Sequence, residues 1–159
     1  MVTVLFQQMK QTNLEETPDV PDKTIEKTEI KLTRLELEYL QNKRLGRLAT
    51  VSKSGRPHVV PVIYSIGNHD RVVISGAGFE KSFKFENMKE NPNVAFVVDS
   101  VKLSPWTPMG IELRGKAHIT TMGNAQKGVE IIATKKVSWG LTEETVAPRS
   151  AAPTDAQAT

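Results

Sequence analysis

Hydrophobic residues of this chain gather in short runs after residue 44, and most of these runs are rich in β-branched side chains. Such runs, bounded by Gly, Pro, Asn and Asp, are typical of β-strands. Residues 111–119 give the clearest pattern, because polar Glu112, Arg114, Lys116 and His118 alternate strictly with their neighbours and so share one face. We predict six strands, over residues 45–51, 57–66, 72–74, 93–99, 111–119 and 129–137.

Two short helices are expected between or before these strands. Thr33 and Glu36 form a capping-box pattern, in which each side chain accepts a hydrogen bond from the other residue's backbone N–H. Apolar residues then recur on one face, which predicts a helix of about ten residues that ends near Lys43. The second helix follows the third strand and stops before Pro92.

Glycine and proline mark the connections. Residues 53–56 have hairpin chemistry, and residues 122–128 form another turn. Pro61 cannot donate to a strand ladder, so the second strand is expected at a sheet edge or a bulge. Residues 104–110 contain two prolines and are expected to form a rigid loop.

This order of elements predicts a mainly β fold with minor α content: a closed, six-stranded antiparallel barrel. Closure also removes exposed sheet edges. Residues 1–30 are polar and rich in turn formers, and we expect a flexible arm that straps onto a partner subunit. Residues 31–141 form the barrel domain, and residues 142–159, rich in Ala, Pro and Thr, are expected to be a disordered tail.

Composition limits the functional classes. The 159 residues suffice for one domain with a real core, and the chain contains no cysteine, which excludes disulfides, thiolate zinc sites and cysteine nucleophiles. No apolar run approaches the roughly 18 residues of a spanning helix. The apolar patch at residues 2–6 lacks a basic lead and a cleavage site, so we expect a cytoplasmic protein with no membrane partner.

The net charge of +3 hides an uneven distribution. Residues 1–30 carry −3 and residues 142–159 carry −2, so the middle of the chain carries +8. A basic middle favours an anionic partner such as a phosphorylated cofactor, a polyanionic tail or nucleic acid.

Residues 71–92 are the best candidate for such an anion site. They read as a strand, a loop with Gly76 and Gly78, and a helix with Ser82, Lys84 and Asn87 near its start. Glycines let the backbone approach a ligand, and a helix N-terminus offers unpaired N–H groups to a phosphate. The alternative is an ordinary strand–helix connection with solvated lysines.

No catalytic apparatus made of side chains is evident, and no metal site is expected. His58, His69 and His118 have no ligand-like spacing, and a strand histidine with satisfied hydrogen bonds is the better interpretation of His58. An enzyme whose cofactor carries the electron chemistry needs no acid–base cluster of its own.

Four motifs in order resemble the flavin-binding split barrels, which include pyridoxamine-phosphate-oxidase-like proteins and flavin/deazaflavin oxidoreductases. They are residues 46–62, the Lys84/Asn87 pair followed by Asn91 and Pro92, residues 105–117, and residues 134–140. The resemblance covers roughly residues 32–141. It implies an FMN-binding type of split barrel, assembled as a homodimer with two cofactor sites at the subunit interface.

The resemblance also implies site residues. Lys84 would bind the cofactor phosphate with support from Ser82 and Asn87. Residues expected beside the ring system are Pro61, Val62, Tyr64, Ser75, Ala77 and Trp139. Phe83 and Glu86 occupy positions that are often basic in the family, which lowers the positive charge available to the phosphate.

The resemblance favours coenzyme F420 as the cofactor, with hydride transfer to or from a small organic acceptor. FMN, in an oxidase or reductase of the same fold, is the alternative. A non-catalytic flavin-binding protein and a barrel for single-stranded nucleic acid are further alternatives. Aromatic residues make up only 6% of the chain, which disfavours the stacking platforms of nucleic-acid barrels, so no nucleic-acid partner is expected.

Overall fold

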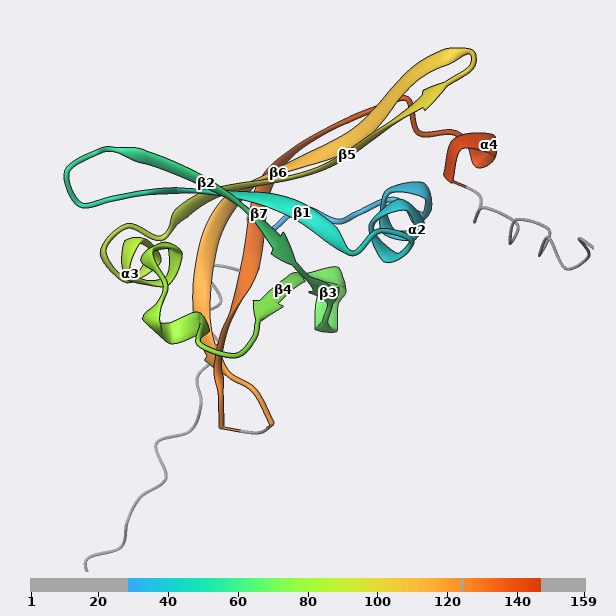
Figure 1. The fold of residues 1–159 in the computed structure, drawn as a ribbon. Helices are drawn as coiled ribbons and strands as arrows, with labels where there is room; N and C mark the ends of the chain where they lie inside the picture. The colour runs from blue at the N-terminus through green and yellow to red at the C-terminus, as the bar shows by residue number, and fades with distance from the viewer. Residues whose placement is uncertain (1–28, 124, 147–159) are drawn as a thin grey trace, which may run out of the picture.

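The computed structural model describes residues 29–123 and 125–146. Seven antiparallel strands form one curled sheet in the order β2-β1-β5-β6-β7-β4-β3 (Figure 1). The strands are β1 (Leu45–Val51), β2 (Pro57–Ile63), β3 (Ser65–Ile66), β4 (Val72–Ser75), β5 (Asn93–Leu103), β6 (Trp106–Thr121) and β7 (Lys127–Trp139). The helices are α2 (Arg34–Gln41), α3 (Phe83–Glu90) and α4 (Glu143–Val146), with 3-10 turns η1 (Asn68–Asp70) and η2 (Phe79–Lys81).

The sheet is a curled half-barrel with seven strands, where the sequence predicted a closed barrel with six. The expected strand over residues 57–66 is divided at Tyr64: β2 pairs with β1, whereas β3 pairs with β4. These two pieces lie at opposite edges of the sheet, so the chain crosses from one edge to the other through Tyr64. Pro61 therefore lies on an edge strand, as its missing N–H predicted.

The prediction of a loop over residues 104–110 is wrong. Strands β5 and β6 stay paired out to Leu103 and Trp106, which leaves only Ser104 and Pro105 in the turn. Pro108 is tolerated inside β6 because β7 ends opposite Gly110, so the proline lies where β6 has a neighbour on one side only. The result is a long hairpin that projects from the body of the sheet (Figure 1).

Helix α2 begins as the capping box predicts. The Thr33 backbone N–H donates to a carboxylate oxygen of Glu36 at 2.8 Å, and the Glu36 N–H donates to the Thr33 hydroxyl at 3.3 Å. Tyr39 and Leu40 on its apolar face are fully buried. The helix thus closes one end of the core.

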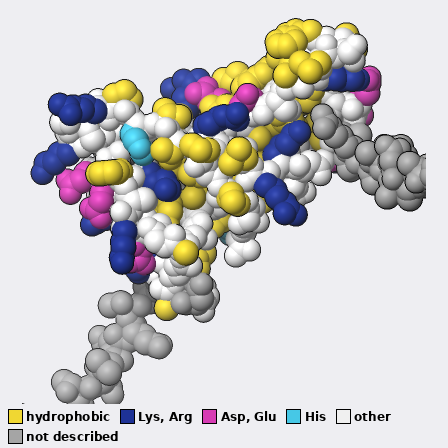
Figure 2. All heavy atoms as spheres, viewed as in Figure 1, with side chains coloured by type: hydrophobic (Ala, Val, Ile, Leu, Met, Phe, Trp, Pro, Cys, Tyr) yellow, Lys and Arg dark blue, Asp and Glu magenta, His cyan; other side chains and the backbone are white. Residues whose placement is uncertain are grey.

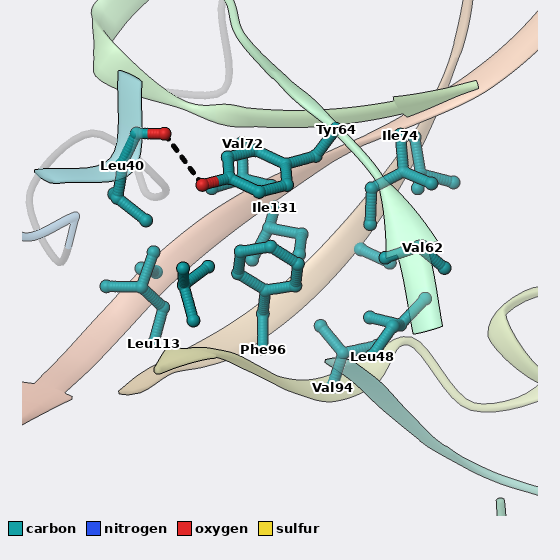
Figure 3. Packing of buried hydrophobic residues seen from close by; sticks show 14 of the residues in the cluster. Leu40, Leu48, Val62, Tyr64, Val72, Ile74, Val94, Phe96, Leu113 and Ile131 are labelled. Atoms are coloured by element: carbon teal, nitrogen blue, oxygen red, sulfur yellow. Dashed lines mark hydrogen bonds between the residues drawn. The ribbon is translucent and has the colours of Figure 1, made fainter. Parts of the chain in front are cut away.

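The core lies inside the curl of the sheet. Tyr64 packs edge-on against Phe96 with ring centroids 5.0 Å apart, and its hydroxyl donates to the Leu40 carbonyl at 2.7 Å (Figure 3). Residues from β1, β4, β5, β6 and β7 surround this pair. A buried tyrosine is stable here because its hydroxyl has a partner.

The N-terminal end of the described chain packs on the sheet, and its C-terminal end packs on helix α2. Ile30 donates its N–H to the Ala133 carbonyl at 3.0 Å, and Glu29 accepts two hydrogen bonds from Arg71. Residues 143–146 of the expected tail form α4, and Val146 is buried, its carbonyl accepting from Asn42. The remaining expectations for the arm and the tail concern residues outside the described part. None of the described helices has the length and apolarity needed to cross a bilayer.

Candidate functional site

A cavity of about 260 Å³ lies between strand β2, the end of β4 and helix α3. Five of the nine expected site residues line it: Pro61, Val62, Ser75, Ala77 and Lys84. The structure therefore brings the second and third predicted strands and the helix lysine to one place. The remaining lining comes from Ile63, Ile74, Gly76, Gly78 and Phe79.

The loop after β4 forms one wall of the cavity. Gly76 and Gly78 have φ angles of +154° and +70°, which side chains disfavour, so the turn into η2 requires glycine. An ideal Cβ at either position would meet no atom within 4 Å, so the backbone there faces open space. Gln126 donates to the Gly76 carbonyl, and the Glu80 carboxylate accepts from the Lys127 N–H at 3.0 Å. The turn before β7 thus holds this loop in position.

Among the described residues, Lys84 is the one ionisable residue in the cavity lining. Its Nζ lies 5.6 Å from the ring centroid of Phe79, a cation–π distance, and it has no carboxylate partner among the described residues. The nearby carboxylate of Glu86 is instead paired with Lys89 at 3.2 Å. The charge of Lys84 is thus available to an anion in the cavity.

Ser82 and Asn87 support the helix and do not line the cavity. Ser82 is the N-cap of α3: its hydroxyl donates to the Phe79 carbonyl at 2.6 Å and accepts from the Phe85 N–H at 3.4 Å. Asn87 donates to the Thr50 hydroxyl on β1 at 3.0 Å. Both residues fix the direction of α3, and through it the position of Lys84.

Tyr64 and Trp139 lie away from the cavity in this chain. Tyr64 is part of the core, and burial raises the pKa of its hydroxyl. Trp139 ends β7 opposite Gly110, where an ideal Cβ on that glycine would be 2.4 Å from the indole. The close approach of the indole therefore leaves no room for a side chain at position 110.

The sequence analysis missed part of the cavity wall. Ile63 and Ile74 flank Val62 and Ser75 on the same strands, and Phe79 lies one turn before α3. The resemblance implied Pro61 and Val62 of β2, whereas the cavity takes three successive residues from that strand. The paired glycines at 76 and 78 were the available signal for the loop.

The surroundings of the cavity are apolar. Ile63 is 72% exposed and Phe83 is 81% exposed, and Val59 and Leu45 follow on the same side of β1 and β2. Figure 2 shows apolar side chains gathered over one face of the molecule and at the tip of the β5–β6 hairpin. Exposed apolar surface of this kind marks a binding or interaction surface.

Other chemistry is sparse in the described part of the chain. No group of three or more His, Asp or Glu residues there could hold a metal ion. His58 is the described residue with a buried side-chain nitrogen, Nδ1, that lacks a partner, and it lies on β2 outside the cavity lining. The expectation of a satisfied strand histidine is therefore wrong for this atom.

Comparison with known proteins places this geometry in a family. Residues 32–154 match the pyridoxamine 5'-phosphate oxidase family. The chain belongs to that family. It is also 34% identical over 118 residues to a 5a,11a-dehydrotetracycline/5a,11a-dehydrooxytetracycline reductase of Streptomyces rimosus, a match that covers 69% of this chain and 83% of the relative.

Solved structures support the fold of this family member. A conserved hypothetical protein of Mycobacterium tuberculosis superposes with a TM-score of 0.60 at 18% identity, over 79% of this chain and 94% of that one. A putative pyridoxamine 5'-phosphate oxidase of Corynebacterium glutamicum (TM-score 0.53, 22% identity) covers 70% of this chain and 94% of its own. An FAD binding protein of Mycobacterium smegmatis (TM-score 0.53, 18% identity) covers 69% and 98%.

Proposed function

We propose that this protein is an oxidoreductase that binds coenzyme F420 in the cavity between β2, β4 and α3, with FMN as the alternative cofactor. The observation that carries the proposal is Lys84, an ionisable side chain without a carboxylate partner, beside walls that are otherwise apolar or backbone. A cofactor with a flat ring and a phosphate needs both features. The reductase relative supports the assignment to oxidoreductases.

The residues present fit such a group. At Gly76 and Gly78 the backbone faces open space, so a ligand can approach it closely. The N–H groups of Phe83 and Lys84 fall in the first turn of an eight-residue helix and have no intrahelical partner. Together with the Lys84 ammonium they suit a phosphate or another anion.

The residues that line the cavity then have separate roles. Lys84 holds the anionic end, while Pro61, Val62 and Ile63 present an apolar wall that excludes water from one face of the ring. The bound cofactor supplies the hydride chemistry. Since no other ionisable side chain of residues 29–123 and 125–146 lines the cavity, orientation and water exclusion are the contributions of these residues to the reaction.

A second copy of the chain is proposed to close the open side of the cavity. Ile63 and Phe83 stand exposed beside it, and exposing large apolar side chains in a monomer is unfavourable. A homodimer with two sites would bury them. The remaining opening would admit a small organic acceptor, by analogy with the dehydrotetracycline compounds in the name of the relative.

Titration of the purified full-length protein with F420 and with FMN tests the cofactor proposal. We expect saturable fluorescence quenching, tighter for F420 than for FMN. Tighter FMN binding would select the alternative cofactor, and no binding of either would overturn the proposed function. Binding of one cofactor without turnover across a panel of organic acceptors would indicate a flavin-binding protein without catalysis.

A further inference from the structure

A second concave surface, which we call the basic groove, lies across β1, β5, β6 and β7. It has a volume of about 470 Å³. Arg114, Lys116 and Lys135 line it, and no carboxylate in the described part of the chain does. None of its lining residues contributes to the cavity at Lys84.

Strand register explains the shape of the groove. Ala49 lies opposite Ala95, Ala95 opposite Arg114, and Arg114 opposite Lys135, so one transverse row runs from two small residues to two cations. Ala49 and Ala95 are half-buried and form the floor of the groove. Arg114 and Lys135 are exposed and form its wall on β6 and β7.

A β-bulge places an extra group in that wall. The pairing of β6 with β7 shifts between Arg114 and Gly115, which leaves Thr134 without an opposed residue. Thr134 and Lys135 are consecutive, yet both are exposed and both line the groove. Bulges re-aim side chains in this way and occur often beside binding sites.

The cations of the groove are mostly unpaired. Arg114 contacts Glu112 at 3.1 Å, whereas Lys116 and Lys135 have no hydrogen-bond or ion-pair partner among the described residues. Three positive charges without a carboxylate in the lining favour an anionic occupant.

We propose that the acidic segment over residues 15–22 of this same chain docks in the basic groove. That segment contains Glu15, Glu16, Asp19 and Asp22 and no basic residue. Its charge of −4 complements that of the groove, and Val20 and two prolines supply apolar contacts for the alanine floor.

The described chain begins close enough to the basic groove for the acidic segment to reach it. Ile30 donates to the Ala133 carbonyl, one residue from Thr134 of the groove. Asp22 precedes Glu29 by seven residues, which allows a reach of up to about 23 Å. The four strands of the groove span only about 14 Å from β7 to β1 at the usual strand spacing. The segment can therefore lie across the groove without stretching.

Zero-length carbodiimide cross-linking of the full-length protein tests this docking. We expect Lys116 or Lys135 to be joined to a carboxylate of residues 15–22 within one chain, as judged by mass spectrometry on mixed isotope-labelled and unlabelled copies. Lys102 and Glu144, paired at 2.9 Å, are the internal positive control. If the control pair is joined but the groove lysines are not, or if they are joined only between copies, the proposal is wrong.

Lysine acetylation rates give a second measurement. Replacing all four acids of the segment (E15Q, E16Q, D19N and D22N) should speed the acetylation of Lys116 and Lys135 about threefold, because weak exposed ion pairs are lost. Lys53, which is 86% exposed on the β1–β2 hairpin, should keep its rate. Unchanged rates at the groove lysines would show that the four acids do not cover them and would overturn the proposal.

Discussion

Asn87 on α3 donates from Nδ2 to the Thr50 Oγ1 on β1 at 3.0 Å, and this bond fastens the helix to the sheet. Thr50 is 1% exposed and donates in turn to the His58 carbonyl at 3.5 Å. The direction of α3 fixes where Lys84 points. Asn87, three positions after Lys84, thus affects the cavity without lining it.

Replacing Asn87 with Ala should lower the free energy of unfolding by about 1–3 kcal/mol, because the buried Thr50 hydroxyl loses the donor of its shorter hydrogen bond. It should also weaken cofactor binding, since Lys84 is less well positioned. Urea unfolding and fluorescence titration would measure the two effects. In a double-mutant cycle with Thr50→Val the two losses should not add; additive losses would show that the bond does not couple the residues.

Lys84→Ala should weaken binding of a phosphate-bearing cofactor by about 1.5–3 kcal/mol, the value of a charge-assisted contact. Binding of riboflavin, which lacks the phosphate, should change little. Lys81→Ala is the matched control, because Lys81 is exposed three residues earlier and does not line the cavity. Equal losses for FMN and riboflavin would place the phosphate elsewhere.

Much of the fold could be predicted because local chemistry decides it. The Thr33–Glu36 capping box and the edge position of Pro61 follow from backbone hydrogen bonding, and both are present. The division of the second strand at Tyr64 could not be predicted, since it depends on the curl of the whole sheet and on a core that takes the tyrosine ring. The long β5–β6 hairpin was not predicted, because the two prolines Pro105 and Pro108 are locally typical of a loop.

The candidate site, like the fold, could be predicted only in part from the sequence. Lys84 was predicted because the strand, glycine loop and helix are consecutive in sequence, whereas Ser75 and Ala77 were implied by the family resemblance, and all three line the cavity. Ser82 and Asn87 were expected to support Lys84 at the phosphate, but their side chains bond to Phe79 and Thr50, contacts that sequence spacing does not show. Trp139 lies at the far end of β7, so any role for it in the site requires a second copy of the chain.

The carboxyl group of Glu36 should make the free energy of unfolding depend on pH. Burial disfavours its charge, but hydrogen bonds from Lys136, the Thr33 N–H and Ser138 outweigh this and lower the pKa of the carboxyl below its ordinary 4.5. A lowered folded pKa contributes stability that is complete above the unfolded value and is lost as pH falls through the folded value. Glu36→Gln should therefore cost about 1–3 kcal/mol at neutral pH and progressively less below about pH 4.5.

Urea unfolding of both proteins at pH 7 and pH 3 would measure this difference. Glu38→Gln is the control, because Glu38 is a more exposed residue of the same helix that pairs with Arg34. A Glu36→Gln penalty that stays the same at both pH values would show that shape, and not charge, is what the site requires.

Ile63→Lys should disrupt a homodimer that closes the cavity. Ile63 is 72% exposed at the end of edge strand β2, directly beside the cavity, so the change leaves the core of each monomer intact. In the dimer the same lysine would be a buried charge without a partner, which is strongly unfavourable. Light scattering should show a dimer for the original protein and a monomer for the variant, with loss of cofactor affinity. Lys53→Glu on the same hairpin should remain dimeric, and a variant Ile63→Lys that stays dimeric would place the subunit interface on another face.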